Sequence, residues 1–173
     1  MGEIREIKEV KLICGLLAVG VERLEQGQAA LEERFGPADL VGEIFPFDFT
    51  SYYAKELGEG ILRQYISFVR LIDPGELAEI KLETNRMEEE LAKAEKRAVN
   101  LDPGYLDLSK MVLASTKDAT YRVYLGQGIY AQSTYYFQNG SYHPWQWTYA
   151  DYQTAIAIGF FNRVREKHKQ QLR

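Results

Sequence analysis

The chain has little of what metal and redox chemistry require: it contains one cysteine, Cys14, and two histidines among 173 residues. A single cysteine excludes an intramolecular disulfide and a cysteine-based zinc site. His143 and His168 have no ligand partner at a useful spacing. We therefore predict no metal site, and the sequence identifies no cofactor. The alternative is a Mg²⁺ ion held by carboxylates and water, for which the candidates are Asp48, Asp102 and Asp118.

An excess of basic residues and a long apolar run are also absent. The 21 Lys and Arg residues are outnumbered by 25 Asp and Glu residues, which gives a net charge of −4. Nucleic-acid binders normally show a basic excess or a basic stripe. The apolar run Leu12–Val19 is far shorter than the ~20 residues that span a bilayer as a helix. We therefore expect a soluble cytoplasmic protein that binds neither nucleic acid nor membranes.

Apolar residues make up 46% of the chain and charged residues 27%, which is typical of globular proteins. At this length we expect a single domain, residues 1–173. Aromatic residues are abundant at 13%, and they include twelve tyrosines. Rings with polar ends are typical of a β-rich core or of a ring-lined cavity.

Hydrophobic periodicity predicts most of the secondary structure. The expected strands are Leu12–Val19, an edge strand at Val41–Thr50, Ile61–Ile72, Met111–Thr116, and a three-strand meander over Tyr121–Trp147. The expected helices are Val21–Phe35, a short one within Ser51–Leu57, one from Asp73 to about Lys93, and Tyr149 to about Lys167. On the middle strand of the meander, the odd positions from Ile129 to Phe137 are expected to share one face.

Turn and capping residues refine these boundaries. Asp73-Pro74-Gly75-Glu76 predicts a capped helix start, and Asn139-Gly140 predicts a hairpin. Asp102-Pro103-Gly104 predicts a turn. Thr148 and Asp151 predict a capping box for the last helix. The resulting fold class is α+β: a largely antiparallel mixed sheet with a ferredoxin-like β-α-β-β-α-β start, extended by the meander and packed with three main helices.

The stretch Ala98–Asp118 concentrates turn-forming, carboxylate, amide and cationic residues around a short apolar run. Inward-facing cations must be paired or bind an anion, because burying a lone charge is costly. One interpretation pairs them inside the protein with Asp48, Glu88, Asp102 and Asp118. The other is a pocket for a small anionic or phosphorylated, nucleotide-like ligand, rimmed by Tyr65, Tyr124, Tyr130 and Trp147. The candidate ligand-binding residues are Arg63, Lys81, Asn85, Asn100, Asp102, Lys117, Asp118, Arg122 and Tyr124.

Six segments resemble a known family. They are F-D-F-T (47–50), K-L-E-T-N (81–85), N-L-D-P-G-Y (100–105), L-A-S-T-K-D (113–118), Y-L-G-Q-G-I-Y-A (124–131) and W-T-Y-A-D-Y (147–152). Together they are similar to an uncharacterised prokaryotic family called domain of unknown function 4416, over nearly the whole chain. The resemblance implies no established activity, although some members carry the label GTP-binding protein. The family usually has a histidine where this chain has Tyr121, so no histidine-based mechanism is expected there.

Nucleotide binding through a standard glycine-rich loop is excluded on physical grounds. A P-loop needs G-x-x-x-x-G-K-[ST], and no glycine of this chain is followed by lysine. Gly126 and Gly128 fall in a predicted hairpin, whereas a dinucleotide fingerprint lies between a strand and a helix. Whether the protein is an enzyme stays open. The alternative function is a non-enzymatic interaction or homodimerisation module that exposes Tyr135, Tyr142 and Trp145 of the meander.

Overall fold

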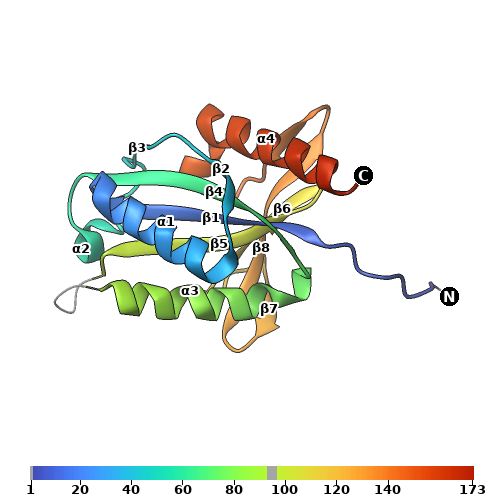
Figure 1. Ribbon diagram of the computed structural model, residues 1–173, viewed down its shortest axis with the longest axis horizontal. Helices are drawn as coiled ribbons and strands as arrows, with labels where there is room; N and C mark the ends of the chain where they lie inside the picture. Colours follow the sequence, from blue (N-terminus) through green and yellow to red (C-terminus); the bar gives the residue numbers. More distant parts are fainter. Residues whose placement is uncertain (1, 93–96) are drawn as a thin grey trace.

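The computed structural model describes residues 2–92 and 97–173. Over these ranges one nine-stranded sheet packs with four α-helices (Figure 1). The strands are β1 Val10–Val19, β2 Ala38–Val41, β3 Phe45–Pro46, β4 Ile61–Ile72, β5 Val99–Leu106, β6 Lys110–Ser115, β7 Arg122–Gly126, β8 Ile129–Gln138 and β9 Ser141–Pro144. The helices are α1 Val21–Phe35, α2 Ala54–Leu57, α3 Leu77–Leu91 and α4 Ala155–Gln171, with 3₁₀ turns at Pro74–Glu76 and Ala150–Gln153.

The strand order confirms the predicted fold class. The sheet runs β2-β4-β1-β5-β6-β8-β7, and its recorded pairings are antiparallel. Its first part, β2-β4-β1-β5, has the order of a ferredoxin-like β-α-β-β-α-β unit. Strands β7, β8 and β9 form the meander, which β6 joins to this unit. The first strand of the chain is thus central, between β4 and β5.

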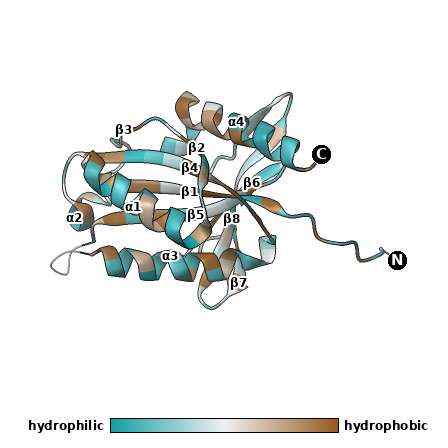
Figure 2. Cartoon of the chain, viewed as in Figure 1, coloured by the Kyte–Doolittle hydropathy of each residue, from teal (hydrophilic) through white to brown (hydrophobic). Residues whose placement is uncertain are grey.

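Helices cover both faces of the sheet, as Figure 1 shows, and β1 is buried on both sides. Leu12, Cys14 and Leu16 pack with α1 and α3. Ile13 packs in a second cluster with α4 and the rings of Phe160 and Phe161. This is why β1 is a continuous apolar run (Figure 2), since strands buried on both faces show no alternation. None of the described helices is both long enough and apolar enough to cross a membrane.

Helix α3 begins as predicted and ends earlier. The Asp73 side chain accepts from the Gly75 N–H, and Glu76 completes the capping box. The helix itself ends at Leu91, and the expected end at Lys93 lies outside the described residues. Within the predicted edge strand at 41–50, only Val41, the last residue of β2, and the two-residue strand β3 are in strands, and both strands pair with β4.

The predicted turn at Asp102-Pro103-Gly104 is wrong, because these residues lie inside β5. Gly104 serves close packing rather than a turn: a Cβ there would overlap the Val112 carbonyl and lie 2.8 Å from Leu113 Cδ2. Pro103 pairs with Cys14 of β1, and the ladder to β6 begins only at Gly104. Proline is tolerated here because no ladder bond to β6 is required of its nitrogen.

The predicted capping box at Thr148 and Asp151 is also wrong. Thr154 caps α4, and its side chain accepts from the Ala157 N–H. Thr148 instead donates its hydroxyl to the Thr134 carbonyl at 2.6 Å. Asp151 is 2% exposed and turns inward toward the sheet. The polar pattern of this segment therefore positions a buried carboxylate, not a helix start.

The single face predicted for the odd positions of β8 is interrupted. Ile129 packs on the α3 side, whereas Tyr135 packs on the α4 side. The pairing with β6 shifts between Met111 and Val112, leaving Thr134 as the extra residue of a bulge. The extra residue shifts the alternation of β8 by one position, so the odd-numbered side chains before and after Thr134 point to opposite faces of the sheet.

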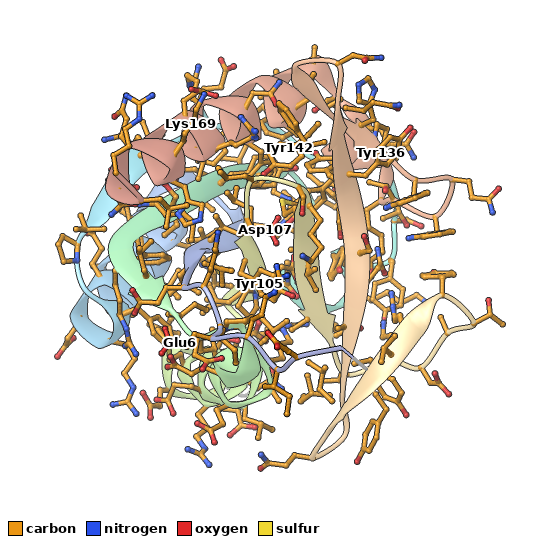
Figure 3. The ribbon with its side chains drawn as sticks, turned by 90° about the vertical axis from the view of Figure 1, so that its right-hand side faces the viewer. Glu6, Tyr105, Asp107, Tyr136, Tyr142 and Lys169 are labelled. Carbon is orange, nitrogen blue, oxygen red and sulfur yellow. The ribbon has the colours of Figure 1, made fainter. Side chains whose placement is uncertain are left out.

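Two of the three residues named for the proposed docking patch are buried. Tyr135 and Tyr142 are 0% and 1% exposed, respectively, and Tyr142 lies next to α4 (Figure 3). Trp145 is 37% exposed. The exposed patch that the interaction-module alternative required is therefore contradicted at two of its three named residues.

Candidate functional site

The site lies where β5 and β6 separate. Their ladder covers Gly104–Leu106 of β5, and the preceding residues of β5 pair with β1 alone among the described strands. Asn100 and Asp102 therefore line one wall of a cleft, while Ser115 and Lys117 at the end of β6 line the other. The end of the ladder at Pro103 thus opens the space that the site occupies.

Two adjoining cavities fill this space. The larger, here called the aromatic cavity, has a volume of about 530 Å³. It is lined by Phe47, Phe49, Thr50, Tyr52, Tyr53, Arg63, Asp102, Lys117, Asp118, Ala119, Tyr121, Arg122, Tyr149, Ala150 and Asp151. The smaller, the polar cavity, has a volume of about 250 Å³. It is lined by Tyr52, Tyr53, Glu56, Lys81, Asn85, Arg97, Asn100, Asp102, Leu113, Ala114, Ser115, Thr116, Lys117 and Tyr149.

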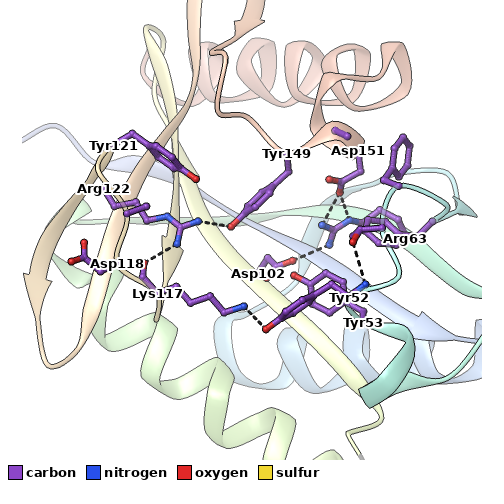
Figure 4. Close-up of a pocket in the computed structure, with 15 residues that line it drawn as sticks. Tyr52, Tyr53, Arg63, Asp102, Lys117, Asp118, Tyr121, Arg122, Tyr149 and Asp151 are labelled. Atoms are coloured by element: carbon purple, nitrogen blue, oxygen red, sulfur yellow. Dashed lines mark hydrogen bonds and ion pairs between the residues drawn. The ribbon is translucent and has the colours of Figure 1, made fainter.

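Arg63 forms the inner wall of the aromatic cavity (Figure 4). From β4 its guanidinium reaches across β1, donating from Nε to Asp151 Oδ2 at 2.7 Å and from Nη1 to Asp102 Oδ2 at 3.0 Å. The crossing depends on Gly15 of β1, where a Cβ would lie 3.0 Å from Arg63 Nη1 and 2.6 Å from the Tyr152 hydroxyl. The Arg63 charge is thus paired inside the protein, with the predicted partner Asp102 and with Asp151, which the first interpretation did not name.

The pairing sets the ionisation of this wall. Burial disfavours a charged Arg63, but Asp151 and the other groups around it raise its pKa well above its ordinary value. Burial likewise disfavours a charged Asp102, yet Arg63 and Lys81 outweigh it and lower the pKa of that carboxyl. Both groups are charged at neutral pH, so Asp102 presents a fixed negative charge between the two cavities.

Lys117 and Arg122 lie on the opposite wall and differ from Arg63 in their partners. Lys117 Nζ donates to the Tyr52 hydroxyl and lies 4.0 Å from the centroid of its ring. Arg122 donates to the Lys117 carbonyl at 2.7 Å and to the Tyr149 hydroxyl at 2.7 Å (Figure 4). Neither cation forms an ion pair with a carboxylate in residues 2–92 and 97–173. Their positive charges are therefore available to an anion entering the cleft.

The polar cavity contains a second group of charges. Arg97 forms ion pairs with Glu56, at 2.9 Å, and with Glu88. Burial raises the pKa of Glu88, and Lys81 and Arg97 oppose that rise. Lys81 is 6% exposed and donates to the Leu101 carbonyl at 2.9 Å. The lining contains three cations, Lys81, Arg97 and Lys117, against the two carboxylates Glu56 and Asp102.

The structure brings together eight of the nine predicted site residues. Arg63, Asp102, Lys117, Asp118 and Arg122 line the aromatic cavity, and Lys81, Asn85, Asn100, Asp102 and Lys117 line the polar cavity. Tyr124 lies outside both, because it is on the edge strand β7 with 59% of its surface exposed.

The predicted aromatic rim is different from the observed one. Tyr65 is buried among Tyr152, Phe160 and Phe161. Tyr130 packs on Tyr124, and Trp147 stacks on Tyr121, with ring centroids 5.4 Å apart. The rings that line the aromatic cavity are instead Phe47, Phe49, Tyr52, Tyr53, Tyr121 and Tyr149.

Sequence reasoning missed Asp151, Arg97 and the four lining tyrosines, Tyr52, Tyr53, Tyr121 and Tyr149. The local sequence pattern predicts a capping role for Asp151, and it predicts a turn in the segment that follows Arg97. Tyr52 and Tyr53 stand next to F-D-F-T, and Tyr149 stands within W-T-Y-A-D-Y, so the segments of the family resemblance were the available signal. Among the described residues, no group of three or more His, Cys, Asp or Glu side chains is arranged to hold a metal ion.

A family model with the description Domain of unknown function (DUF4416) matches residues 8–168 of the chain. The matched range includes the residues lining both cavities. It confirms the resemblance carried by the six sequence segments. No curated protein matches the chain, and neither does any solved structure. The chain belongs to the family described as Domain of unknown function (DUF4416).

Proposed function

We propose that the protein binds a small anionic or phosphorylated molecule of nucleotide-like size in the cleft between β5 and β6. The observation that carries this proposal is the convergence of Lys117 and Arg122, two cations without an ion-pair partner among the described residues, on a ring-lined cavity of about 530 Å³. Ligand pockets of a few hundred Å³ typically combine apolar rings with a few polar groups that orient the ligand.

Cations outnumber carboxylates by three to two in the lining of the polar cavity, which favours an anion there. Arg63 engages both Asp102 and Asp151, so its single positive charge offsets one of these two negative charges. Arg122 donates to neutral oxygens of Gln132, Ser115, Lys117 and Tyr149, which use four of its five N–H groups and orient its guanidinium without neutralising its charge. Its uncompensated positive charge and remaining N–H group can attract a carboxylate or phosphate.

The test is a thermal-shift screen of nucleotides, sugar phosphates, carboxylates and divalent metals on the wild type and on Lys117→Ala. A ligand at a hundredfold excess over Kd stabilises the native state by about 2.7 kcal/mol. For a chain of this size we expect a rise in Tm of roughly 5–10 °C. Lys117→Ala is expected to lose most of that rise, because it removes a charge shared by both cavities.

Lys110→Ala is the matched control. Lys110 is at the other end of β6, is 46% exposed, and pairs with Asp107 away from both cavities. We expect this variant to keep the full ligand-induced shift. A screen in which no compound stabilises the wild type, or in which both lysine variants retain the shift, contradicts ligand binding at this cleft.

A further inference from the structure

The polar cavity contains a buried amide group with unused donors. Asn100 is 3% exposed, and its Oδ1 accepts from Arg97 Nη2 at 2.7 Å. A guanidinium can only donate, so this contact fixes the amide with its oxygen toward Arg97 and its Nδ2 directed elsewhere. That Nδ2 has no hydrogen-bond partner among the described residues. Buried polar groups are nearly always hydrogen-bonded in native proteins, so the exception calls for an acceptor.

The nearest carboxylates are engaged by other groups. Asp102 accepts from Arg63 at 3.0 Å, and Glu88 Oε1 accepts from the Leu101 N–H at 2.6 Å. Asn100 lowers the pKa of Asp102 as a hydrogen-bonding neighbour, but the contact from its Nδ2 falls outside ordinary hydrogen-bond geometry. Neither carboxylate therefore gives Nδ2 an acceptor with full hydrogen-bond geometry.

Lys81 adds donors to the same cavity. Its ammonium has three N–H groups and uses one on the Leu101 carbonyl. It forms no ion pair with a carboxylate in the described part of the chain. The ammonium group of Lys117, at the junction of the two cavities, is the third donor group after the Asn100 amide and the Lys81 ammonium. The donors thus come from three elements: α3, β5 and the end of β6.

Donors that converge from three elements suit a tetrahedral group with three free oxygens. A carboxylate presents two oxygens in one plane, whereas a phosphate monoester presents three around its phosphorus. The two most deeply placed donors, Lys81 and Asn100, are both buried, so the group they receive is at the inner end of the ligand. The adjoining aromatic cavity offers rings, including Tyr52 and Tyr149, against which a planar group can stack.

We infer that the polar cavity is the subsite for a terminal phosphate, and that the ligand is a phosphomonoester whose remaining part carries a ring held in the aromatic cavity. This inference rests on the proposed function and names the ligand class of the same cleft. It assigns the phosphate to Lys81, Asn100 and Lys117, and the ring to the aromatic cavity.

The experiment measures binding of the four common ribonucleoside 5′-monophosphates, the matching nucleosides and inorganic phosphate by calorimetry. We expect at least one monophosphate to bind, its nucleoside to bind at least tenfold more weakly, and inorganic phosphate to compete with it. Asn100→Asp keeps an acceptor for Arg97 and places a negative charge where the phosphate would be. It is expected to weaken monophosphate binding at least tenfold.

Asn139→Asp is the matched control, because it makes the same chemical change in the exposed hairpin between β8 and β9, outside the lining of both cavities. A monophosphate that binds both variants equally, or a nucleoside that binds as tightly as its monophosphate, overturns the phosphate subsite while ligand binding at the cleft stands. If carboxylates bind and no monophosphate does, the phosphate subsite is likewise overturned and ligand binding at the cleft stands. If no compound of this set or of the earlier screen binds the wild type, the proposed function itself fails.

Discussion

Arg63 extends its charge across the middle of the sheet and meets two carboxylates on different elements, Asp102 of β5 and Asp151 before α4. Its guanidinium also lies 5.3 Å from the ring centroids of Tyr65 and Tyr152. One side chain therefore links three parts of the fold that are distant in sequence. Removing it would leave two carboxylates without their common partner in a buried setting.

At this residue we expect Arg63→Met to lower the free energy of unfolding by about 3–5 kcal/mol, because an uncompensated buried charge is left behind. Arg70→Met is the matched control on the same strand. Arg70 pairs with Glu76, but its side chain is 48% exposed, against 3% for Arg63. Exposed pairs contribute roughly 0–1 kcal/mol, so the control is expected to lose less than that. Urea unfolding measures both, and equal losses would contradict a structural role for the Arg63 pairs.

At the scale of an element, β5 shows how tightly one strand is fitted. A side chain at Gly104 would overlap Val112 of β6 and crowd Ile13 of β1. Gly104→Ala is therefore expected to destabilise the protein by about 1–3 kcal/mol, the usual cost of overpacking.

Gly159→Ala is the opposite case, since Gly159 is exposed in α4 and a Cβ there meets nothing within 4 Å. Alanine is expected to stabilise the helix by about 0.5–1 kcal/mol. Thermal unfolding of the two variants should shift Tm in opposite directions. A Gly104→Ala protein as stable as the wild type would mean that β5 and β6 separate further than the pairing indicates.

The helices and strands differ in how well the sequence predicts them. Val21–Phe35 and Ile61–Ile72 were predicted to the residue, because local periodicity and glycine boundaries determine them. Strand β5 was missed because Pro103 and Gly104 have the composition of a turn, and only the approach of β6 explains the glycine. The bulge at Thr134 depends on a partner strand, so no local pattern reveals it.

The residues of the candidate site also divide into those that a local sequence pattern predicts and those that depend on contacts distant in sequence. Composition predicted most of its charged and amide residues, since inward-facing cations need partners or ligands. Their convergence depends on the pairing of β1 with both β4 and β5, which is long-range information. Asp151 followed a capping pattern locally, and only the position of Arg63 explains its burial. The tyrosines of the aromatic cavity were indistinguishable from core tyrosines for the same reason.

The buried His168 makes the free energy of unfolding of the whole protein depend on pH. It is 1% exposed, and its Nδ1 has no hydrogen-bond partner among the described residues. Burial, assisted by Lys11 and opposed by Asp107, lowers the pKa of His168 below its ordinary value. In the window between the lowered pKa and the unfolded value near 6.5, the unfolded chain binds more protons than the folded one. Stability must therefore fall as the pH falls through this window.

We expect the free energy of unfolding to decrease below pH 6.5, with a contribution from His168 of at most about 1.4 kcal/mol per pH unit. His168→Gln should flatten the dependence in this window, because glutamine does not titrate. Urea titrations at pH 7.5, 6.5 and 5.5 compare the two proteins. An identical slope in both would show that His168 takes up its proton equally in the folded and unfolded states.

The central position of β1 has a consequence for how the chain is made. Its apolar residues are synthesised before either neighbour exists, because β4 follows about 50 residues later, or roughly 2.5–10 s at ~5–20 residues per second. β5 follows later still, and the cleft between β5 and β6 comes after that. During this interval the most hydrophobic strand of the nascent chain has no partner strand. Chaperones bind exposed apolar segments of this kind. Strand β1, which is buried on both faces in the folded protein, is thus the strand that waits longest for both of its partners during synthesis.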